Sequence, residues 1–551
     1  MESARASLDQ LVANFDWIPN VTHLHDFNTL LHSNDPPSPL QSVDLKYSLD
    51  NMVYITQKLQ AALDLVGNTV ASLEAHMSRV QSLQHDYEIM LSPIRRVPAE
   101  IITEILYCTQ TTAEDPDGAP FGGYNVFTGA KGPWLLGQVC RPWRDVVSTF
   151  CPRLWATMTI SIPDSWRRNG NKKHTMEMLE HALERTRGHP LDFLFEDHNS
   201  LDGEECDVMD RCFNLMNACS VRWRRAGFIV PPSLLRCLSR FRGKIDLLED
   251  AYVHCRAVLG QQPSRVTGFE IAPRLKSLRL DGIDADVQFP FPTANLVSYK
   301  DERSFAGDQL NPEYVRIFKS SPKLLSFSFH DSVHTTRHIG PPSSQPRVTS
   351  RSIQALSVSS ATLLRIIDVP ALREVVLRPA RDLPYMHLPR GVIISLSELI
   401  RHSHCSLTRL SVADVTIVGD NLMAVLRLTP CLQELSVRFN GWSKVYEPGM
   451  ESLVDSLAET MLEDGPAQHS LVPSLTSLVI VLTEVGDTCI SFVDPSFVAM
   501  ITSRHESGAL MKLVLHIEGK MRTYGLRSAD ETDLMLLQLT GLALDYVIKD
   551  V

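Results

Sequence analysis

Between residues 275 and 515 the chain repeats the pattern L-x-x-L-x-L, with Ile, Val or Phe replacing some of the leucines. The second half of each copy alternates apolar with other residues at a period of two, which predicts a half-buried β-strand. Amphipathic segments of helical period separate several copies, for example at 312–320 and 450–462. One strand and one helix cannot bury their apolar faces alone, so stacked copies are expected to form one α/β unit. Eight well-formed copies place their apolar residues at Leu275, Leu278 and Leu280; Leu324, Phe327 and Phe329; Ile353, Leu356 and Val358; Leu372, Val375 and Leu377; Leu407, Leu410 and Val412; Leu432, Leu435 and Val437; Leu475, Leu478 and Ile480; and Leu510, Leu513 and Leu515.

This repeated unit resembles irregular leucine-rich repeats. The resemblance implies a C-terminal leucine-rich-repeat-like solenoid over 161–551, and an ordinary α/β domain with Leu-rich strands is the alternative. The copies are about 19 to over 40 residues apart, which predicts irregular curvature. Leu296 and Tyr299 form a degenerate copy, and 341–346 reads as an exposed loop. The run from Asp533 to Ile548 is expected to be a helix that caps the open end.

The positions between the apolar residues of each predicted strand should face outward, because the apolar residues fill the core. These outward residues are mostly small and carry little charge. Such a face suits a protein or peptide target better than nucleic acid, whose phosphates demand Arg and Lys. The candidate target-binding residues are Arg279, Ser328, Ser357, Val376, Ser411 and Ser436, with Val479 and Val514 at equivalent positions.

Residues 92–160 carry apolar residues at helical spacing in two halves. Pro98 suits the first turn of a helix, and Pro142 is expected to begin or kink a later one. The loop between the halves, 108–132, is rich in Gly, Asp and Thr and is expected to be disordered or functional. Helices this short cannot stand alone, and a small bundle of them would leave apolar surface for a partner.

This segment resembles the F-box-like family, in its fungal branch. The resemblance rests on unlike residue types in the family's order, namely Pro93-Ile94, Val97-Pro98-Ala99-Glu100-Ile101, Val139-Cys140, Trp143-Arg144 and Pro152-Arg153-Leu154-Trp155. It implies a small helical module over 92–160 that docks a Skp-type adaptor and, through it, a cullin. The candidate adaptor-binding residues are Val97, Pro98, Ile101, Ile105, Leu135, Val139, Trp143 and Val147, some of which must belong to the core of the module.

Residues 43–91 carry an apolar or aromatic residue every seven positions, at Leu45, Met52, Leu59, Val66, Leu73, Val80 and Tyr87. A sustained heptad predicts a long helix in a coiled coil, with this stripe facing inward. Because the second seam, read at Ser48, Thr69 and His76, is mixed, a continuous or once-bent helix packed on the chain's own domain is an equal alternative. Self-association through 43–91 is one expected contact. Residues 1–42 are expected to be a weakly structured lead in which Asp35 to Pro39 breaks any helix.

The 551 residues exceed one typical core, so several domains are expected. The formal net charge of -11 argues against nucleic-acid binding. The eleven cysteines include no Cys-x-x-Cys pair, the N-terminus has no secretory pattern, and no apolar run reaches roughly 18 residues. These features predict a cytoplasmic or nuclear protein with reduced thiols and no membrane contact.

The sequence contains no motif for phosphate binding, nucleophilic catalysis or zinc-dependent hydrolysis. His402, His404 and Cys405 lack a second ligand pair at zinc-finger spacing. No catalytic residue, cofactor or metal is therefore expected. The leading hypothesis is a non-catalytic substrate receptor of a cullin–RING ubiquitin ligase, acting in ubiquitin-dependent protein degradation through proximity. The alternative is a non-ligase scaffold that keeps the F-box-like fold.

Overall fold

The computed structural model divides the chain into two compact units, Met1–Pro98 and Ala99–Val551. Besides single residues such as Phe121 and Leu388 and a few before Pro36, the residues that it describes are 36–109, 123–129, 131–161, 172–197, 207–255, 264–304, 310–330, 347–379, 391–414, 421–461, 468–485, 490–519 and 528–550.

The first unit contains α3, a continuous helix of 53 residues from Pro39 to Leu91. Ser38 caps its start: the Ser38 hydroxyl accepts the N–H of Gln41, and the Gln41 side chain accepts the N–H of Ser38. Pro39 follows in the first turn, where its missing N–H is no loss. The predicted long helix is therefore confirmed, and it is continuous. Residues 36–38, within the predicted break from Asp35 to Pro39, are not helical, and α3 begins directly after them at Pro39.

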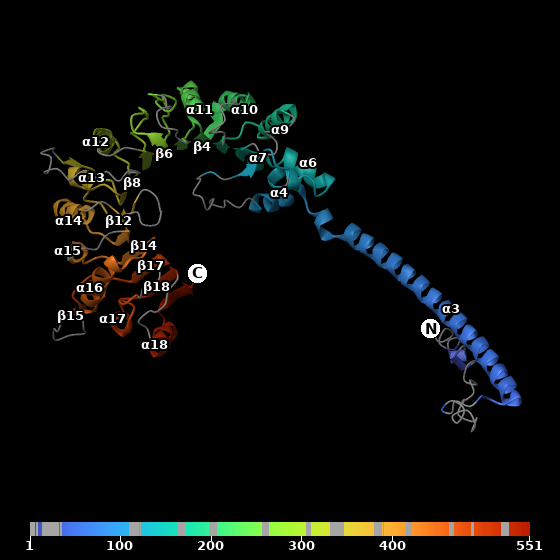
Figure 1. Cartoon of the computed structure of the whole chain (residues 1–551). Helices are drawn as coiled ribbons and strands as arrows, with labels where there is room; N and C mark the ends of the chain where they lie inside the picture. Colours follow the sequence, from blue (N-terminus) through green and yellow to red (C-terminus); the bar gives the residue numbers. More distant parts are fainter. Residues whose placement is uncertain are drawn as a thin grey trace. The chain divides into compact units, whose positions relative to one another are not determined.

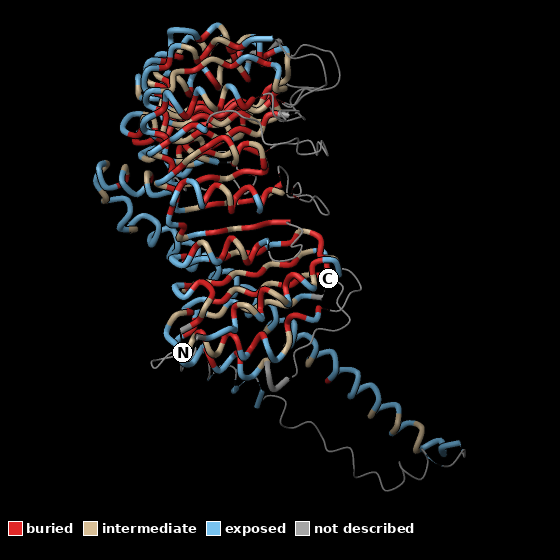
Figure 2. The backbone as a smooth tube through the Cα atoms, turned by 90° about the vertical axis from the view of Figure 1, so that its left-hand side faces the viewer, coloured by how far each residue is buried: buried red, intermediate tan, exposed pale blue. Residues whose placement is uncertain are grey.

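Most of α3 is exposed (Figure 2). Ile55 is its one buried side chain among the described residues, and Leu59 and Val66 are half-buried. Leu73 and Val80, by contrast, are 67% and 61% exposed. The alternative in which the helix packs along the chain's own domain is therefore wrong for the second half of the helix, and the coiled coil with another chain stays a prediction. A short 3-10 helix, η2 (Pro93–Arg96), follows α3.

The second unit contains one parallel sheet of fifteen strands, whose spatial order follows their order in the chain. Figure 1 shows the strands along the inner side of an arc and the helices along its outer side. The strands are β1 (Tyr124–Asn125), β2 (Thr157–Ser161), β3 (Leu191–Glu196), β4 (Trp223–Val230), β5 (Asp250–Cys255), β6 (Ser277–Asp284), β7 (Ser298–Ser304), β8 (Ser326–Phe329), β10 (Ala355–Val358), β12 (Glu374–Leu377), β13 (Arg409–Ala413), β14 (Glu434–Phe439), β17 (Ser477–Val485), β18 (Lys512–Gly519) and β19 (Ala543–Asp550).

The L-x-x-L-x-L pattern supplies the core between the sheet and the helices. Each of its eight predicted copies contains one strand of the sheet, and every apolar residue of these copies is at most 1% exposed. The predicted strands and their inward residues are therefore confirmed. The chain is a mixed α/β protein with a long N-terminal helix and a large parallel sheet.

The helices of the second unit lie between these strands or before them. They are α4 (Ala99–Cys108), α5 (Gly132–Leu136), α6 (Arg141–Thr149), α7 (Pro152–Ala156), α9 (Lys172–Arg185), α10 (Asp207–Ala218), α11 (Pro232–Cys237), α12 (Asn311–Ser320), α13 (Ala361–Ile366), α14 (Val392–Ser403), α15 (Asn421–Arg427), α16 (Glu447–Ala458), α17 (Pro495–Glu506) and α18 (Ser528–Leu539). Shorter elements are η3 (Ser220–Arg222), η4 (Leu238–Phe241), η6 (Lys444–Tyr446), the parallel pair β9 (Val348–Thr349) and β11 (Ile367–Asp368), and the antiparallel pair β15 (Thr460–Met461) and β16 (Gln468–His469).

Two sequence predictions need correction here. The run from Asp533 to Ile548 is not one helix, because α18 ends at Leu539 and β19 joins the sheet. Gly541 between them has a φ of +106°, a conformation that glycine adopts without steric cost. Part of the loop 108–132 is ordered core, since β1 pairs with β2 and Val126 is fully buried.

Two further expectations concern prolines. Pro142 is the second residue of α6, so it begins this helix and does not kink it. The predicted exposed loop at 341–346 lies outside the described residues. Across the described part of the chain, no helix has both the length and the apolar character that a membrane span requires.

Candidate functional site

The helical segment α4–α7 leaves large apolar side chains in contact with solvent. On α4, Ile102 and Leu106 are buried, while Ile101 and Ile105 are 52% and 42% exposed. Leu135 and Val139, further along the segment, are 46% and 60% exposed. A ten-residue helix with isoleucines on both its inner and outer sides is apolar beyond what its own packing needs. Exposed apolar side chains of this kind mark a candidate protein interface.

The inner side of this segment is held by tryptophan rings that pack edge to face. The indole N–H of Trp155, which is 2% exposed, donates to the carbonyl of Val147 at 2.9 Å. The ring of Trp134 packs edge-on against Trp155 at 4.8 Å between centroids. Arg185 of α9 lies over both rings, at 5.0 and 4.8 Å from their centroids. The sequence analysis did not single out Trp134 or Arg185. The available signal was that Trp134 directly precedes the apolar residues of the second helical half of 92–160.

The remaining candidate adaptor-binding residues divide between surface and core. Val147 is 1% exposed, so it belongs to the core of the segment and cannot contact a partner. Trp143 is half-buried on α6. Val97 and Pro98, at the end of the first unit, are half-buried and exposed respectively. α4 packs on α6, which joins the two halves of the predicted module in spite of the loop between them.

The strand register aligns the candidate target-binding residues in one line across the sheet. Successive pairs are Arg279 with Lys300, Lys300 with Ser328, Ser328 with Ser357, Ser357 with Val376, Val376 with Ser411, and Ser411 with Ser436. This line, called here the central row, continues through Val479 and Val514. The members of the central row are half-buried. On each strand, the residues directly before and after the row member are buried and point into the core beneath the helices. The central row therefore lies on the face of the sheet that the helices do not cover, the helix-free face.

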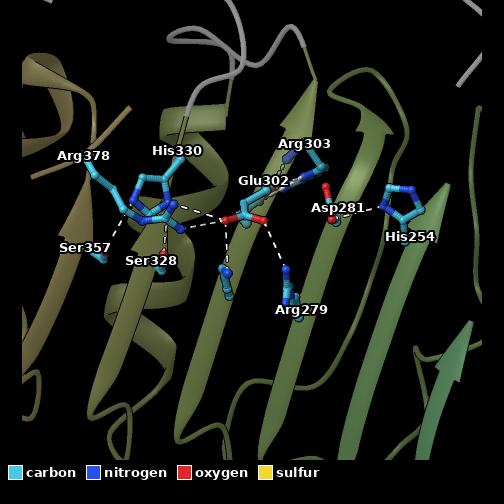
Figure 3. Close-up of polar contacts among 11 residues, drawn as sticks. His254, Arg279, Asp281, Glu302, Arg303, Ser328, His330, Ser357 and Arg378 are labelled. Atoms are coloured by element: carbon cyan, nitrogen blue, oxygen red, sulfur yellow. Dashed lines mark hydrogen bonds and ion pairs between the residues drawn. The ribbon is translucent and has the colours of Figure 1, made fainter. Parts of the chain in front are cut away.

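A carboxylate at the centre of the helix-free face gathers three cations (Figure 3). One oxygen of Glu302 lies 3.1 Å from the ammonium of Lys300 and 3.1 Å from the guanidinium of Arg378. Its other oxygen lies 3.4 Å from the guanidinium of Arg279. Burial lowers the pKa of Lys300, and the attraction of Glu302 offsets this only in part. The consecutive strands β6 and β7 thus meet Arg378, the residue directly after β12, at one polar centre.

His330 ties two of the candidate target-binding residues into this centre. Its Nδ1 lies 3.2 Å from the hydroxyl of Ser328, and its Nε2 lies 3.0 Å from the hydroxyl of Ser357. Burial, assisted by the positive charges of Arg378 and Lys300, lowers the pKa of His330 to about 2. The imidazole is therefore neutral at physiological pH, with one donor and one acceptor nitrogen. It crosslinks β8 and β10 and fixes how the two serines face outward.

Toward β3 the same face becomes apolar, because a residue from the loop before β1 covers it. Phe121 is 8% exposed and packs with Leu194 and Tyr252. Gly227 lies on β4, between Leu194 of β3 and Tyr252 of β5. A Cβ at Gly227 would stand 2.7 Å from Leu194 Cδ1 and 3.1 Å from Phe121 Cδ2. A glycine inside a strand often marks such a close approach. The helix-free face therefore has an apolar end already filled by the chain and a polar centre that is partly open.

The polar groups of the helix-free face hold one another in place through the ion pairs of Glu302 and the hydrogen bonds of His330. In the ranges covered by the structure, no three His, Cys, Asp or Glu side chains are placed to hold a metal ion. His402 and His404 are exposed near the end of α14, and Cys405 is buried. Compared with known proteins, the chain matches no family model and no curated protein.

Proposed function

We propose that this chain is a non-catalytic substrate receptor of a cullin–RING ubiquitin ligase. In this proposal the helical segment α4–α7 docks a Skp-type adaptor. The fifteen-stranded unit acts as a leucine-rich-repeat-like solenoid whose helix-free face takes a target protein. The observation that carries the proposal is the exposure of Ile101, Ile105, Leu135 and Val139 on a segment whose inner side is packed. The resemblance of 92–160 to the F-box-like family supplies the partner.

The mechanism of such a receptor is proximity. A target held on the helix-free face and an adaptor held on α4–α7 become parts of one assembly, so the effective concentration of the target at the partner enzymes rises. The ubiquitin transfer takes place on partner subunits. A cytoplasmic or nuclear location is part of the proposal, and the free cysteines of the described residues are compatible with a reducing compartment.

Replacing Ile101 and Ile105 together by Glu is expected to abolish capture of the full chain by a purified Skp-type adaptor. Each change would bury an unpaired carboxylate in an apolar interface, which costs several kcal/mol. Every 1.4 kcal/mol corresponds to about a tenfold change in the dissociation constant, so the loss should exceed about a hundredfold. Replacing Val97 and Pro98 by Asp and Gly should have the same effect. The measurement is adaptor binding by surface plasmon resonance.

The matched control carries Glu at Val445 and Met511, which are 68% and 62% exposed and lie far from α4–α7 in the sequence. This variant adds the same charge and removes the same kind of side chain, so its adaptor binding should equal that of the unmodified chain. Equal binding by the Ile101 and Ile105 variant and this control would remove the ligase proposal.

Replacing Ser411 and Ser436 by Glu is expected to change the set of proteins that the receptor captures. The two hydroxyls are neighbours in the central row, so two carboxylates there would repel each other and any acidic target surface. Proximity labelling in cells measures the captured set. A variant with Glu at Ser474 and Ser507, exposed serines in turns, is the control. Identical neighbours from all three proteins would show that this face does not select the target.

A second candidate function is a scaffold that assembles through α3 and does not join a ligase. The exposure of the apolar side chains along the second half of α3 favours this candidate, because an exposed apolar surface of this kind also marks an interaction site. The adaptor measurement separates the two functions, since a scaffold of this kind has no need of Ile101 and Ile105.

A further inference from the structure

The exposed side of α3 carries a complete heptad when the second seam is placed four residues after the first. Every residue of the first seam is then followed, four residues later, by one that is apolar or uncharged. The first seam is Leu45, Met52, Leu59, Val66, Leu73, Val80 and Tyr87; the second is Leu49, Thr56, Leu63, Val70, Met77, Gln84 and Leu91. Alternating steps of four and three residues are the spacing of the d and a positions of a coiled coil. The polar residues Ser48, Thr69 and His76 flank this stripe and do not interrupt it.

The stripe is most exposed in the second half of the helix. Its apolar residues from Val70 onward are at least 48% exposed, and Leu73 and Leu91 reach 67% and 66%. At 1.5 Å per residue the helix is about 80 Å long. A helix in water owes most of its stability to the packing of its apolar face. An unbroken helix of 53 residues with an exposed stripe therefore needs a second surface against it.

We propose that α3 pairs with α3 of a second copy of this chain, parallel and in register. Two residues of the second seam, Thr56 and Gln84, are polar. In a parallel pair each a position faces the same position of the partner, so Thr56 meets Thr56 and Gln84 meets Gln84. In an antiparallel pair a positions face d positions, which are all apolar or aromatic here, so neither Thr56 nor Gln84 would face a polar side chain across the seam. Polar a positions of this kind set register and orientation.

The charges beside the seams agree with this orientation. In a parallel pair each residue before an a position faces the partner residue five places further on. Thr69 then faces Glu74, and Leu83 faces Glu88, so no two like charges meet at these positions. In the single chain Gln84 donates to Glu88 at 2.9 Å, a contact that an amide pair across the seam can replace.

Such pairing goes beyond the receptor function and does not depend on it. A paired receptor presents two helix-free faces, so a target with two sites, or a target that is itself a dimer, would bind with avidity. A chain that fails to pair can still be a receptor, and a chain that pairs can still lack an adaptor. The two proposals are therefore tested separately.

Light scattering coupled to size exclusion is expected to give the full chain a mass of about 123 kDa, twice its 61.7 kDa. Replacing Leu73 and Val80 by Glu should halve this mass, because it places four carboxylates in the seam of a pair. The control variant has Glu at Ser72 and Ser82, on the outer side of the same turns, and should keep the mass of two chains. A single-chain mass for the unmodified protein would overturn the proposal, as would a mass of three or more chains.

Orientation is tested with one cysteine on an otherwise unmodified chain, which also covers the case in which the seam variant misfolds. The chain has no cysteine before Cys108. In a parallel, in-register pair Gln84→Cys should form a disulfide with the same residue of the second copy under mild oxidation. Ser82→Cys, on the outer side, should not exceed the background of the native cysteines. Equal crosslinking by the two variants would overturn the parallel register.

Discussion

Replacing Arg303 by Met is expected to destabilise the second unit by about 3–5 kcal/mol, among the largest effects of a single substitution. Arg303 and Asp301 on β7 are both fully buried, on the side of the sheet that faces the helices. The guanidinium donates to Asp301 at 2.7 and 3.0 Å and lies 3.1 Å from Glu313 of α12. Removing the cation would leave the carboxylate of Asp301 buried with no counter-charge of comparable geometry.

The surroundings of this pair make the effect specific. Tyr299 and Tyr314 donate to the same oxygen of Asp301, at 2.7 and 3.1 Å. Burial alone would lower the pKa of Arg303, but the attraction of Asp301 outweighs it and holds the pKa well above its usual value. The guanidinium is thus charged at neutral pH.

Urea unfolding followed by circular dichroism measures the effect. Arg316→Met, on the exposed side of α12, is the control and should shift the midpoint little. The double variant Asp301→Asn with Arg303→Met should recover part of the loss, because it removes both charges. A midpoint for Arg303→Met equal to that of Arg316→Met would show that the buried pair contributes nothing to stability.

The same strand shows where sequence reasoning could not reach. The strands of the eight L-x-x-L-x-L copies could be predicted because their apolar residues alternate with a period of two. β7 follows the same alternation, but its inward residues are Tyr299, Asp301 and Arg303. A pattern of apolar and polar residues reads two of these as outward. Only the pairing of charges inside the core explains why they are buried.

The candidate target face was predictable in part for the same reason. Alternation alone assigned Arg279 and Ser411 to the outward side, and the register places both in the central row. The contacts of Arg279 and Arg378 with Glu302 join residues that are 23 and 76 positions apart in the sequence, and no local pattern carries that information. The cover that Phe121 provides was equally hidden, because it comes from a loop before the first strand.

Replacing Arg504 by Met is expected to cost about 3 kcal/mol or more, because buried carbonyls that lose their donors cost about 1–3 kcal/mol each. Arg504 lies on α17 and is fully buried. The three hydrogen bonds that the structure shows for its guanidinium go to the carbonyls of Leu457, Leu471 and Val472, at 2.8, 2.7 and 3.3 Å.

These carbonyls also explain how the charge is tolerated. Leu457 is in the last turn of α16, whose terminal carbonyls carry partial negative charge and favour a cation. Burial lowers the pKa of Arg504 to about 10, so the group still carries its charge at neutral pH. Arg504→Lys keeps the charge but cannot present the planar fork that reaches three carbonyls, so it should recover only part of the stability. Arg427→Met, exposed in the last turn of α15, is the control for the loss of an arginine from a helix end. Hydrogen exchange should rise in α16 and in 469–472 of the Arg504 variants, since the guanidinium bridges these segments, and unchanged exchange there would show that apolar packing alone holds them together.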